Sequence, residues 1–553
     1  MNDFIKELVI TRVALMCLIM FSLVGCSGGS GGGEPPVSEP SLSLDNLSVN
    51  YLPIGEMIVP IRFINSGGGS LLECRTDSLP AGLAIQITTD GNSCEIIGTP
   101  NTLQGVEIHR IIAENDTGIS DVWIDISVTS PLLTTWKTDN PGVSGNNQVL
   151  ITTSPNHEYD YNVDWGDGTK TRNIQGDYTH DYDSPGTYTI TISGLFPQTY
   201  FDLDVSLSDA QKLLTIEQWG TYPWRGGYAA FANCENLVVE ASDTPNMSFV
   251  TDMRFMFYNA TNFNADISQW DVSSVEKMHS MFYKAINFNG DISQWDVSSV
   301  STMSRMFAFA SKFKSDLSQW DVSNVTDMRA MFYEATSFNS DISQWDVSNV
   351  RDMGLMFTNA VNFNSDISQW DVSSVTSMFA MFNVADNFNS DISQWDVSSV
   401  TSMYNMFHGA DNFNSDISQW DVSSVTSMHG MFSSAVSFNR DISQWDVSSV
   451  DDMSYMFDYA LSFNQNIGGW NIESVTDMTR MFRSAKLSTE NYDALLLGWS
   501  SQNVQQDVVF DAGSSAYSSA GEIARNVLID NYNWVIYDAG NFKALDPNLV
   551  ERR

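Results

Sequence analysis

The stretch from Asp266 to Gly290, DISQWDVSSVEKMHSMFYKAINFNG, decides the fold of this chain, because close copies of it follow one another without an insertion. Tryptophan returns every 25 residues at nine positions, and ten methionine pairs keep the same phase. A repeat of this length is typical of units that stack and share one core. The repeating tryptophans are Trp270, Trp295, Trp320, Trp345, Trp370, Trp395, Trp420, Trp445 and Trp470.

The spacing of apolar residues inside the unit predicts that each repeat has a strand on one side and a helix on the other. Counted from Ile267, apolar residues lie at offsets 0, 3, 5, 8 and 11, which are the inward positions of a leucine-rich repeat, so we expect a short Trp-x-Val strand. From Met278 they follow at i+3, i+4, i+7 and i+10, which predicts a short helix opposite the strand. The tryptophans and methionines are therefore expected to be core residues.

The repeats occupy residues 251–487, and both flanks depart from the consensus. Residues 203–250 keep a degenerate pattern and are predicted to form an N-terminal cap. Residues 488–553 are predicted to form a C-terminal cap, with amphipathic segments around Tyr492 to Trp499 and around Ala520 to Ile529. Terminal units must hide the open end of a stacked core, so atypical ends are expected.

The first residues resemble an export signal. Lys6 and Arg12 precede an apolar run from Val13 to Val24 that is short for a membrane span. The sequence Leu-Val-Gly-Cys ending at Cys26 resembles the lipobox of bacterial lipoproteins, which implies residues 1–25 as signal peptide and Cys26 as the lipidated residue. Residues 26–40 read as a Gly/Ser/Pro tether. By the same resemblance, Ser27 rather than Asp after the Cys implies an outer-membrane lipoprotein. The alternatives are a signal cut elsewhere and an uncleaved anchor, with Cys26 incidental.

Residues 41–130 contain short β-branched runs broken by Gly, Asn and Pro, which predicts an antiparallel sandwich. The motifs LPAGL from Leu79 and IGTP from Ile97 resemble the putative-Ig (He-PIG) domains of bacterial surface proteins. In an exported protein, a disulfide between Cys74 and Cys94 is expected, and two buried thiols are the alternative.

Residues 131–202 contain the run VDWGDGT from Val163 and the strand-like TYTITI from Thr187. This segment resembles the polycystic-kidney-disease (PKD) Ig-like fold. Asp164, Asp167 and His180 could suggest a metal or catalytic site, but we expect them to shape turns, as Gly-Asp-Gly runs do.

The unit WDVSxVTxMxxMFxxAxxFNxDIS itself resembles the 25-residue lipoprotein-associated repeats grouped with BspA-type leucine-rich-repeat surface proteins. The expected fold class is mixed, with two antiparallel β-sandwich (Ig-like) modules followed by an α/β leucine-rich-repeat solenoid of 25-residue units. The resemblance implies a surface-exposed, adhesive interaction scaffold and no catalytic residues.

Two columns of aspartates run through the repeats, one after each tryptophan and one five residues earlier, as in Asp266. Like charges so close repel, and three explanations stay open. These are Ca²⁺ bound by hard oxygen ligands, hydrogen bonds from the aspartates to turn backbone and to neighbouring Ser or Gln, and a solvated acidic face suited to a salty medium or a cationic partner. The first column, the candidate ligand or cation ladder, is Asp271, Asp296, Asp321, Asp346, Asp371, Asp396, Asp421 and Asp446.

Composition excludes some functions. The 553 residues carry 67 acidic and 26 basic side chains, a net charge of −41, which argues against nucleic-acid binding. No catalytic histidine motif or phosphate loop occurs, and identical carboxylates in every unit fit a scaffold better than an enzyme. We therefore expect a non-enzymatic, lipid-anchored scaffold for a protein or glycan ligand. A carbohydrate-binding or carbohydrate-active envelope protein is the alternative.

Overall fold

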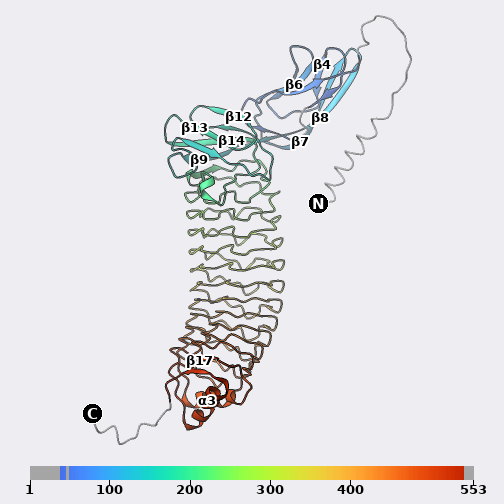
Figure 1. Ribbon diagram of the computed structural model, residues 1–553. Helices are drawn as coiled ribbons and strands as arrows, with labels where there is room; N and C mark the ends of the chain where they lie inside the picture. The colour runs from blue at the N-terminus through green and yellow to red at the C-terminus, as the bar shows by residue number, and fades with distance from the viewer. Residues whose placement is uncertain (1–37, 45–48, 541–553) are drawn as a thin grey trace.

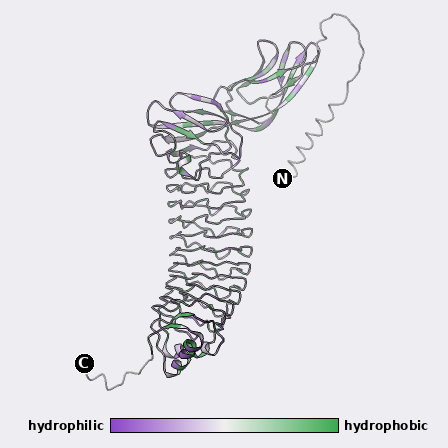
Figure 2. Ribbon diagram, in the orientation of Figure 1, coloured by the Kyte–Doolittle hydropathy of each residue, from purple (hydrophilic) through white to green (hydrophobic). Residues whose placement is uncertain are grey.

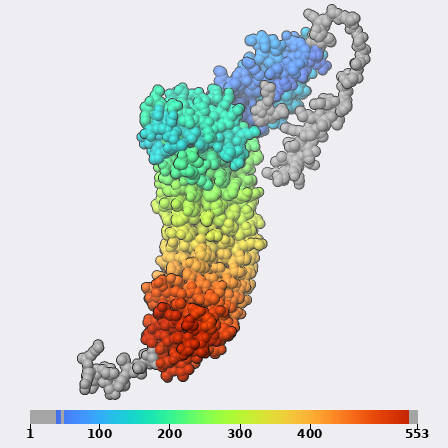
Figure 3. Space-filling view, in the orientation of Figure 1, coloured from blue at the N-terminus to red at the C-terminus, as the bar shows by residue number. Residues whose placement is uncertain are grey.

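The structure is a computed structural model that describes residues 38–44 and 49–540. The predicted lipidation site, Cys26, the first 37 residues and the last 13 lie outside the described residues. A long stack of coils carries a β-rich module at its N-terminal end, and a second β-rich module projects from the first at an angle (Figure 1). The space-filling view shows the nearer module seated directly on the stack (Figure 3).

The projecting module, residues 38–130, holds two four-stranded sheets around one core that includes Phe63, Ile96 and Ile126. Hydrophobic and hydrophilic residues alternate along its strands (Figure 2), as expected of sheets with one buried face. The pairing is antiparallel except between β2 and β8. The sheets are β1 (Leu42–Ser43), β3 (Ile61–Asn65), β6 (Ser93–Gly98) and β5 (Leu83–Ile87), and β2 (Asn50–Pro53), β8 (Gly118–Thr129), β7 (Gln104–Asn115) and β4 (Glu73–Thr76).

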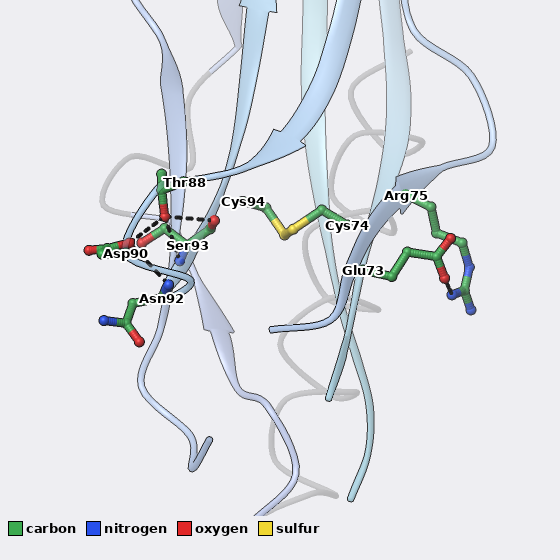
Figure 4. Close-up of a disulfide and its surroundings, with 8 residues drawn as sticks. All are labelled: Glu73, Cys74, Arg75, Thr88, Asp90, Asn92, Ser93 and Cys94. Atoms are coloured by element: carbon green, nitrogen blue, oxygen red, sulfur yellow. Dashed lines mark hydrogen bonds and ion pairs between the residues drawn. A yellow bond between two sulfur atoms is a disulfide. The ribbon is translucent and has the colours of Figure 1, made fainter. Parts of the chain in front are cut away.

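A disulfide joins the two sheets of this module. It links Cys74 on β4 to Cys94 on β6, with 5.8 Å between their Cα atoms (Figure 4). Cys94 is completely buried among the core residues. The described chain has one free cysteine, Cys234, which is buried at the start of the coils.

The second module continues into the stack. Its six-stranded sheet has the order β12-β11-β14-β9-β15-β16, and a two-stranded sheet, β10-β13, faces it. The last two strands of this sheet, β15 and β16, come from the region expected to cap the repeats, so the sheet is continuous with the first coils. One hydrophobic core therefore runs from Leu132 in the module to Ile536 beyond the repeats. The strands are β9 (Leu132–Lys137), β10 (Gln148–Ile151), β11 (Asp160–Asp164), β12 (Lys170–Ile174), β13 (Tyr178–Asp181), β14 (Thr187–Leu195), β15 (Leu213–Gln218) and β16 (Val238–Val239).

The expected α/β leucine-rich-repeat solenoid is wrong. Within residues 251–487 there is no α-helix and no strand at the Trp-x-Val positions. Each repeat is a flat coil of consecutive turns, and successive coils meet at a single-residue parallel bridge, such as Asp252 with Lys277 and Lys277 with Thr302. The regular secondary structure of the chain is therefore mostly β. The two α-helices of the described chain, α2 (Thr489–Ser500) and α3 (Ser519–Tyr532), lie beyond the repeats.

Backbone hydrogen bonds explain why the helical spacing does not give a helix. The N–H groups of Met278, Ser280 and Phe282 donate to carbonyls of the next coil, at 2.9–3.2 Å. The intervening N–H groups of Met281 and Tyr283 donate three residues back within their own coil. A run of such turns spaces its apolar residues much as a helix does, but half of its donors point to the neighbouring coil. The sequence pattern cannot separate these two structures.

Two residues in each coil adopt the left-handed conformation, which an α-helix excludes. In the second coil these are Ser280, with φ 53°, and Lys284, with φ 57°. The same two positions recur every 25 residues from Phe255 and Asn259 to Arg480 and Ser484, and glycine occupies them only at Gly409 and Gly430. Non-glycine residues rarely take this conformation because Cβ clashes with the backbone. The bonds between coils must therefore offset a repeated local cost.

The core is made of side-chain columns that cross the coils. Each tryptophan from Trp295 to Trp470 donates its indole N–H to the carbonyl of residue 28 positions earlier, as from Trp370 to Ile342 at 3.1 Å. Phenylalanine rings stack between coils, with 5.7 Å between the ring centroids of Phe357 and Phe382. The predicted core role of tryptophan and methionine is confirmed, since these repeat positions are at most 5 % exposed.

Both ends of the stack are covered by other structure. At the first end, Lys212 and Asp209 form a fully buried ion pair. The Lys212 ammonium also donates to the carbonyls of Ser144, Gly145 and Gln148 at 2.9–3.1 Å. At the last end, α2 and α3 flank a parallel pair, β17 (Val509–Asp511) and β18 (Val535–Tyr537), and β17 extends the ladder of bridges.

The tryptophan column predicts a specific loss of stability. In Trp370→Phe the buried carbonyl of Ile342 loses its indole donor and keeps only the backbone N–H of Trp345, which costs about 0.5–1.5 kcal/mol. The smaller ring also leaves part of the core unfilled, which adds to this cost. Thermal unfolding of the full chain should show a clear drop in midpoint. Trp123→Phe is the matched control, because Trp123 on β8 is 57 % exposed. Equal, small shifts for both variants would contradict this role.

The buried ion pair gives a second prediction. Lys212→Met leaves Asp209 charged and buried without its cation, so we expect a loss of about 3–5 kcal/mol in unfolding free energy. In the control Lys137→Met, the pair with Asp139 is 42 % exposed on both sides, so little change in unfolding free energy is expected. Denaturant unfolding measures both variants, and a neutral Lys212→Met would refute the role given to the pair.

Candidate functional site

The aspartate columns form turns at the surface of each coil. Asp271 Oδ1 accepts the backbone N–H of Ser273 at 3.1 Å and its hydroxyl at 2.6 Å. Asp266 Oδ1 accepts the backbone N–H of Ser268 at 3.0 Å. The same contacts recur along the stack, and the residues remain solvent-exposed. Both columns therefore shape local backbone, as short polar side chains do in turns.

These hydrogen bonds favour the charged carboxylate. The hydroxyl and then the backbone N–H of Ser273 hold the pKa of Asp271 below its usual value. The backbone N–H and then the hydroxyl of Ser293 do the same for the pKa of Asp291. The pKa is lowered in this way at Asp266, Asp271, Asp291, Asp321, Asp341, Asp371, Asp391, Asp416 and Asp421.

No group of three or more His, Cys, Asp or Glu side chains within the described ranges has an arrangement that could hold a metal ion. In the second module, Asp164 Oδ1 accepts the Gly166 N–H, and Asp167 Oδ1 accepts the Thr169 N–H. Asp167 also contacts His180 Nε2 at 2.8 Å, and the His180 ring stacks on Trp165. Asp164 and Asp167 thus hold the turn between β11 and β12, and Asp167 alone of the two contacts His180 on β13.

A second surface of the coils varies from repeat to repeat. We define the variable face as positions 254, 255, 258 and 259 and their equivalents every 25 residues, on the run of turns that follows each bridge. Methionine, phenylalanine and alanine between these positions are buried in the core. At the variable positions, small residues such as Ser304 are also buried, whereas large ones such as Tyr258 and Tyr283 are half-buried at the surface. Many of the differences among units fall on this face, whereas the residues around the two aspartate columns are nearly uniform.

Aromatic side chains gather on the variable face in two groups. In the first group, Tyr258 and Tyr283 stack with 4.9 Å between ring centroids, and Phe309 follows Tyr283 at 5.3 Å. In the second group, Tyr404 stacks on His429 at 4.6 Å. The first group is Tyr228, Phe255, Tyr258, His279, Tyr283, Phe309 and Tyr333, and the second is Phe379, Tyr404, His429, Tyr455 and Tyr459.

Cationic side chains lie against both aromatic groups. The Lys284 ammonium is 5.7 Å from the ring centroid of Tyr283, and the Arg480 guanidinium is 5.4 Å from that of Tyr455. Burial lowers the pKa of His279 and of His408, which favours their neutral forms. Aromatic rings flanked by cations are common at binding surfaces.

The sequence reveals this face only in part. Residues at the positions of Arg254, His279, Arg305, Arg329, Tyr404 and Tyr455 differ from unit to unit. The sequence does not reveal the contacts between the aromatic side chains, because the rings of one group come from adjacent columns of different repeats, such as Phe309 beside Tyr283 and Tyr333. Aligning the units in columns shows aromatic residues at these positions, but only the stacking of coils brings them into contact.

The lowered aspartate pKa values predict acid sensitivity. A pKa below the unfolded value, about 3.9 for Asp, gives stability that is present above that pH and is lost as pH falls through the folded-state pKa. The unfolding midpoint should therefore fall steeply below about pH 4. The triple variant Asp321→Asn, Asp371→Asn and Asp421→Asn keeps a turn acceptor and should flatten this decline.

Asp386→Asn is the control of opposite sign, because burial and then the charge of Asp411 raise the pKa of Asp386. Removing this charge should leave or raise the midpoint at pH 7. Thermal unfolding monitored between about pH 7 and pH 2.5 makes the comparison. An unchanged pH profile for the triple variant would show that these carboxylates do not link folding to pH.

Comparison with known proteins finds a family similar to the repeats, but that family has no known function. A family model described as "Mycoplasma protein of unknown function, DUF285" matches residues 228–338, 308–403 and 386–495. No curated protein matches the chain. No helix in the described ranges is both long enough and apolar enough to cross a membrane.

Two solved structures of titin show weak similarity. A three-domain Ig structure of a Glu-to-Ala variant is 13 % identical, with a TM-score of 0.15, and the match covers 29 % of this chain and 56 % of that one. A chimeric titin with an exogenous peptide from decorin is 16 % identical, with a TM-score of 0.16, and the match covers 30 % and 86 %. This chain spans just over half the length of the first, and scores this low carry no structural conclusion. What the comparisons do show is a repeat protein whose residues 228–495 are similar to the DUF285 family.

Proposed function

We propose that this chain is a lipid-anchored bacterial surface protein whose stacked coils serve as an adhesion or ligand-binding scaffold, without a catalytic role. The variable face is the proposed contact surface, and its partner is a protein or a glycan. The lipobox-like sequence ending at Cys26 supports the anchor, and the tether at residues 26–40 would hold the folded chain away from the membrane.

The contrast between the two sides of the coils carries this proposal. Residues that build the stack are nearly identical in every unit, because their side chains form the core and the turns and their backbone groups bond to the adjacent coils. Side chains on the variable face differ from unit to unit, and several of them are rings, such as Tyr258, Tyr283 and Phe309, with a neighbouring ammonium from Lys284. Half-buried aromatic residues beside cations provide contact area at a small entropic cost.

The same geometry favours binding over catalysis. The aspartates are engaged in repeated turns, and His279 and His429 each contact a serine hydroxyl of the next coil. Equivalent side chains in many units provide an extended surface and no unique reaction centre. Surface labelling of intact cells tests the proposed exposure, and labelling confined to lysed cells would contradict it.

Substitution of the aromatic face tests the binding role. The triple variant Tyr258→Ser, Tyr283→Ser and Tyr333→Ser removes three rings of the first group. The full chain and the variant are compared on an array of purified glycans and extracellular proteins, with at least about tenfold weaker binding expected for the variant. The control, Gln294→Ala, Gln319→Ala and Gln344→Ala, changes three exposed residues of the aspartate side. Equal binding by the variant and wild type, or no binding by wild type, would overturn the proposal.

A further inference from the structure

A polar hollow lies along four adjacent coils, on an edge of the stack distinct from the variable face. Its volume is about 510 Å³, and its lining combines amides, ammonium groups and one hydroxyl. Each coil contributes equivalent positions, so the hollow extends along the axis of the stack. The lining residues are Asn262, Asn264, Asn287, Asn289, Lys312, Lys314 and Ser337.

The hollow lies where a structural ladder is interrupted. Along the edge, an asparagine Oδ1 in each coil accepts the backbone N–H of its equivalent in the next, as Asn264 accepts from Asn289 at 2.8 Å. The ladder continues from Asn339 to Asn464 at 2.8–3.0 Å. Lys314 takes the place of one asparagine, and the N–H of Asn339 has no equivalent bond in the described chain. The repeat gives up a hydrogen bond between coils at this one place, and it gains an exposed ammonium.

The lysines are not explained by ion pairing. Neither Lys312 nor Lys314 forms a salt bridge with the described residues, whereas arginines such as Arg254 and Arg483 pair with aspartates on their own or a neighbouring coil. Basic residues also concentrate here: residues 251–325 carry 8 acidic and 6 basic side chains, and residues 326–475 carry 19 acidic and 3 basic. The hollow thus lies in the least acidic part of the repeats.

We propose that this hollow binds an anionic oligosaccharide that lies along the stack. Asparagine amides both donate and accept hydrogen bonds, so they match sugar hydroxyls, and lysine ammonium groups match carboxylate or sulfate substituents. The lining contains no aromatic residue on which nucleic-acid bases could stack. This inference rests on the proposed binding role of the coils but places the ligand on a different surface.

The test uses the full chain and calorimetric titration with three acidic hexasaccharides: galacturonate, hyaluronan and chondroitin sulfate. Neutral cellohexaose and an oligothymidylate are the comparison probes. The variant Lys312→Asn with Lys314→Asn gives the hollow the residues of the neighbouring coils and restores the ladder. It should therefore unfold at an equal or higher temperature than wild type. The control Arg351→Gln with Arg440→Gln removes the same charge elsewhere on the coils.

We expect at least one acidic hexasaccharide to bind in a salt-dependent manner and cellohexaose to bind more weakly. The lysine variant should lose about tenfold or more in affinity, and the arginine control should change it little. Binding of none of the three acidic sugars, an unchanged affinity in the lysine variant, or equally tight binding of oligothymidylate would each overturn the inference. The variant with three tyrosines changed to serine should bind these sugars normally, which separates this site from the variable face.

Discussion

Backbone hydrogen bonds between successive coils are the interaction on which the rest of this structure depends. They take alternate N–H groups, as at Met278, Ser280 and Phe282, and direct them into the next repeat. An isolated coil would still contain two left-handed residues, which cost free energy, but it would lack the hydrogen bonds to a neighbouring coil that compensate for this cost. The indole donors and the asparagine ladder act along the same axis. A single coil therefore has no stable form of its own, and the stack is the folding unit.

Because the coils must bond to one another, some surface positions tolerate substitution less than others. On one side, each aspartate holds a turn, and the turn sets where the next tryptophan enters the core. Such positions can change little, and the uniform acidity of that side follows from its structural use. On the variable face, side chains neither cap turns nor bridge coils in a fixed pattern. Side-chain chemistry there can vary without disturbing the ladder, which is the property that a binding scaffold requires.

The sequence was sufficient to predict the period of the repeats and the residues of their core. Apolar residues at offsets such as those of Ile267, Trp270 and Val275 must face inward whatever the backbone does between them, and all three are buried. The helix was wrong because a spacing of three and four residues is shared by an α-helix and by successive three-residue turns. What separates them is the direction of the N–H groups, and side-chain pattern does not encode it.

The candidate surfaces were predictable to different degrees. Turn roles for Asp164 and Asp167 followed from their place beside glycines, and the structure shows the corresponding bonds. The aromatic groups and the lysine-lined hollow were not predictable, because both bring together residues of successive coils. Contacts of this kind depend on the register between coils, which the structure supplies.

The most direct test of the coil architecture compares glycine with alanine at Ser434, where φ is 60°. A left-handed position favours glycine, so Ser434→Gly should be more stable than Ser434→Ala by about 1 kcal/mol. In the expected helix the order would reverse, since alanine exceeds glycine by about 1 kcal/mol there. Denaturant unfolding of the two variants gives the sign of this difference. A more stable glycine variant is the result predicted by left-handed turns joined between coils, and a more stable alanine variant would contradict it.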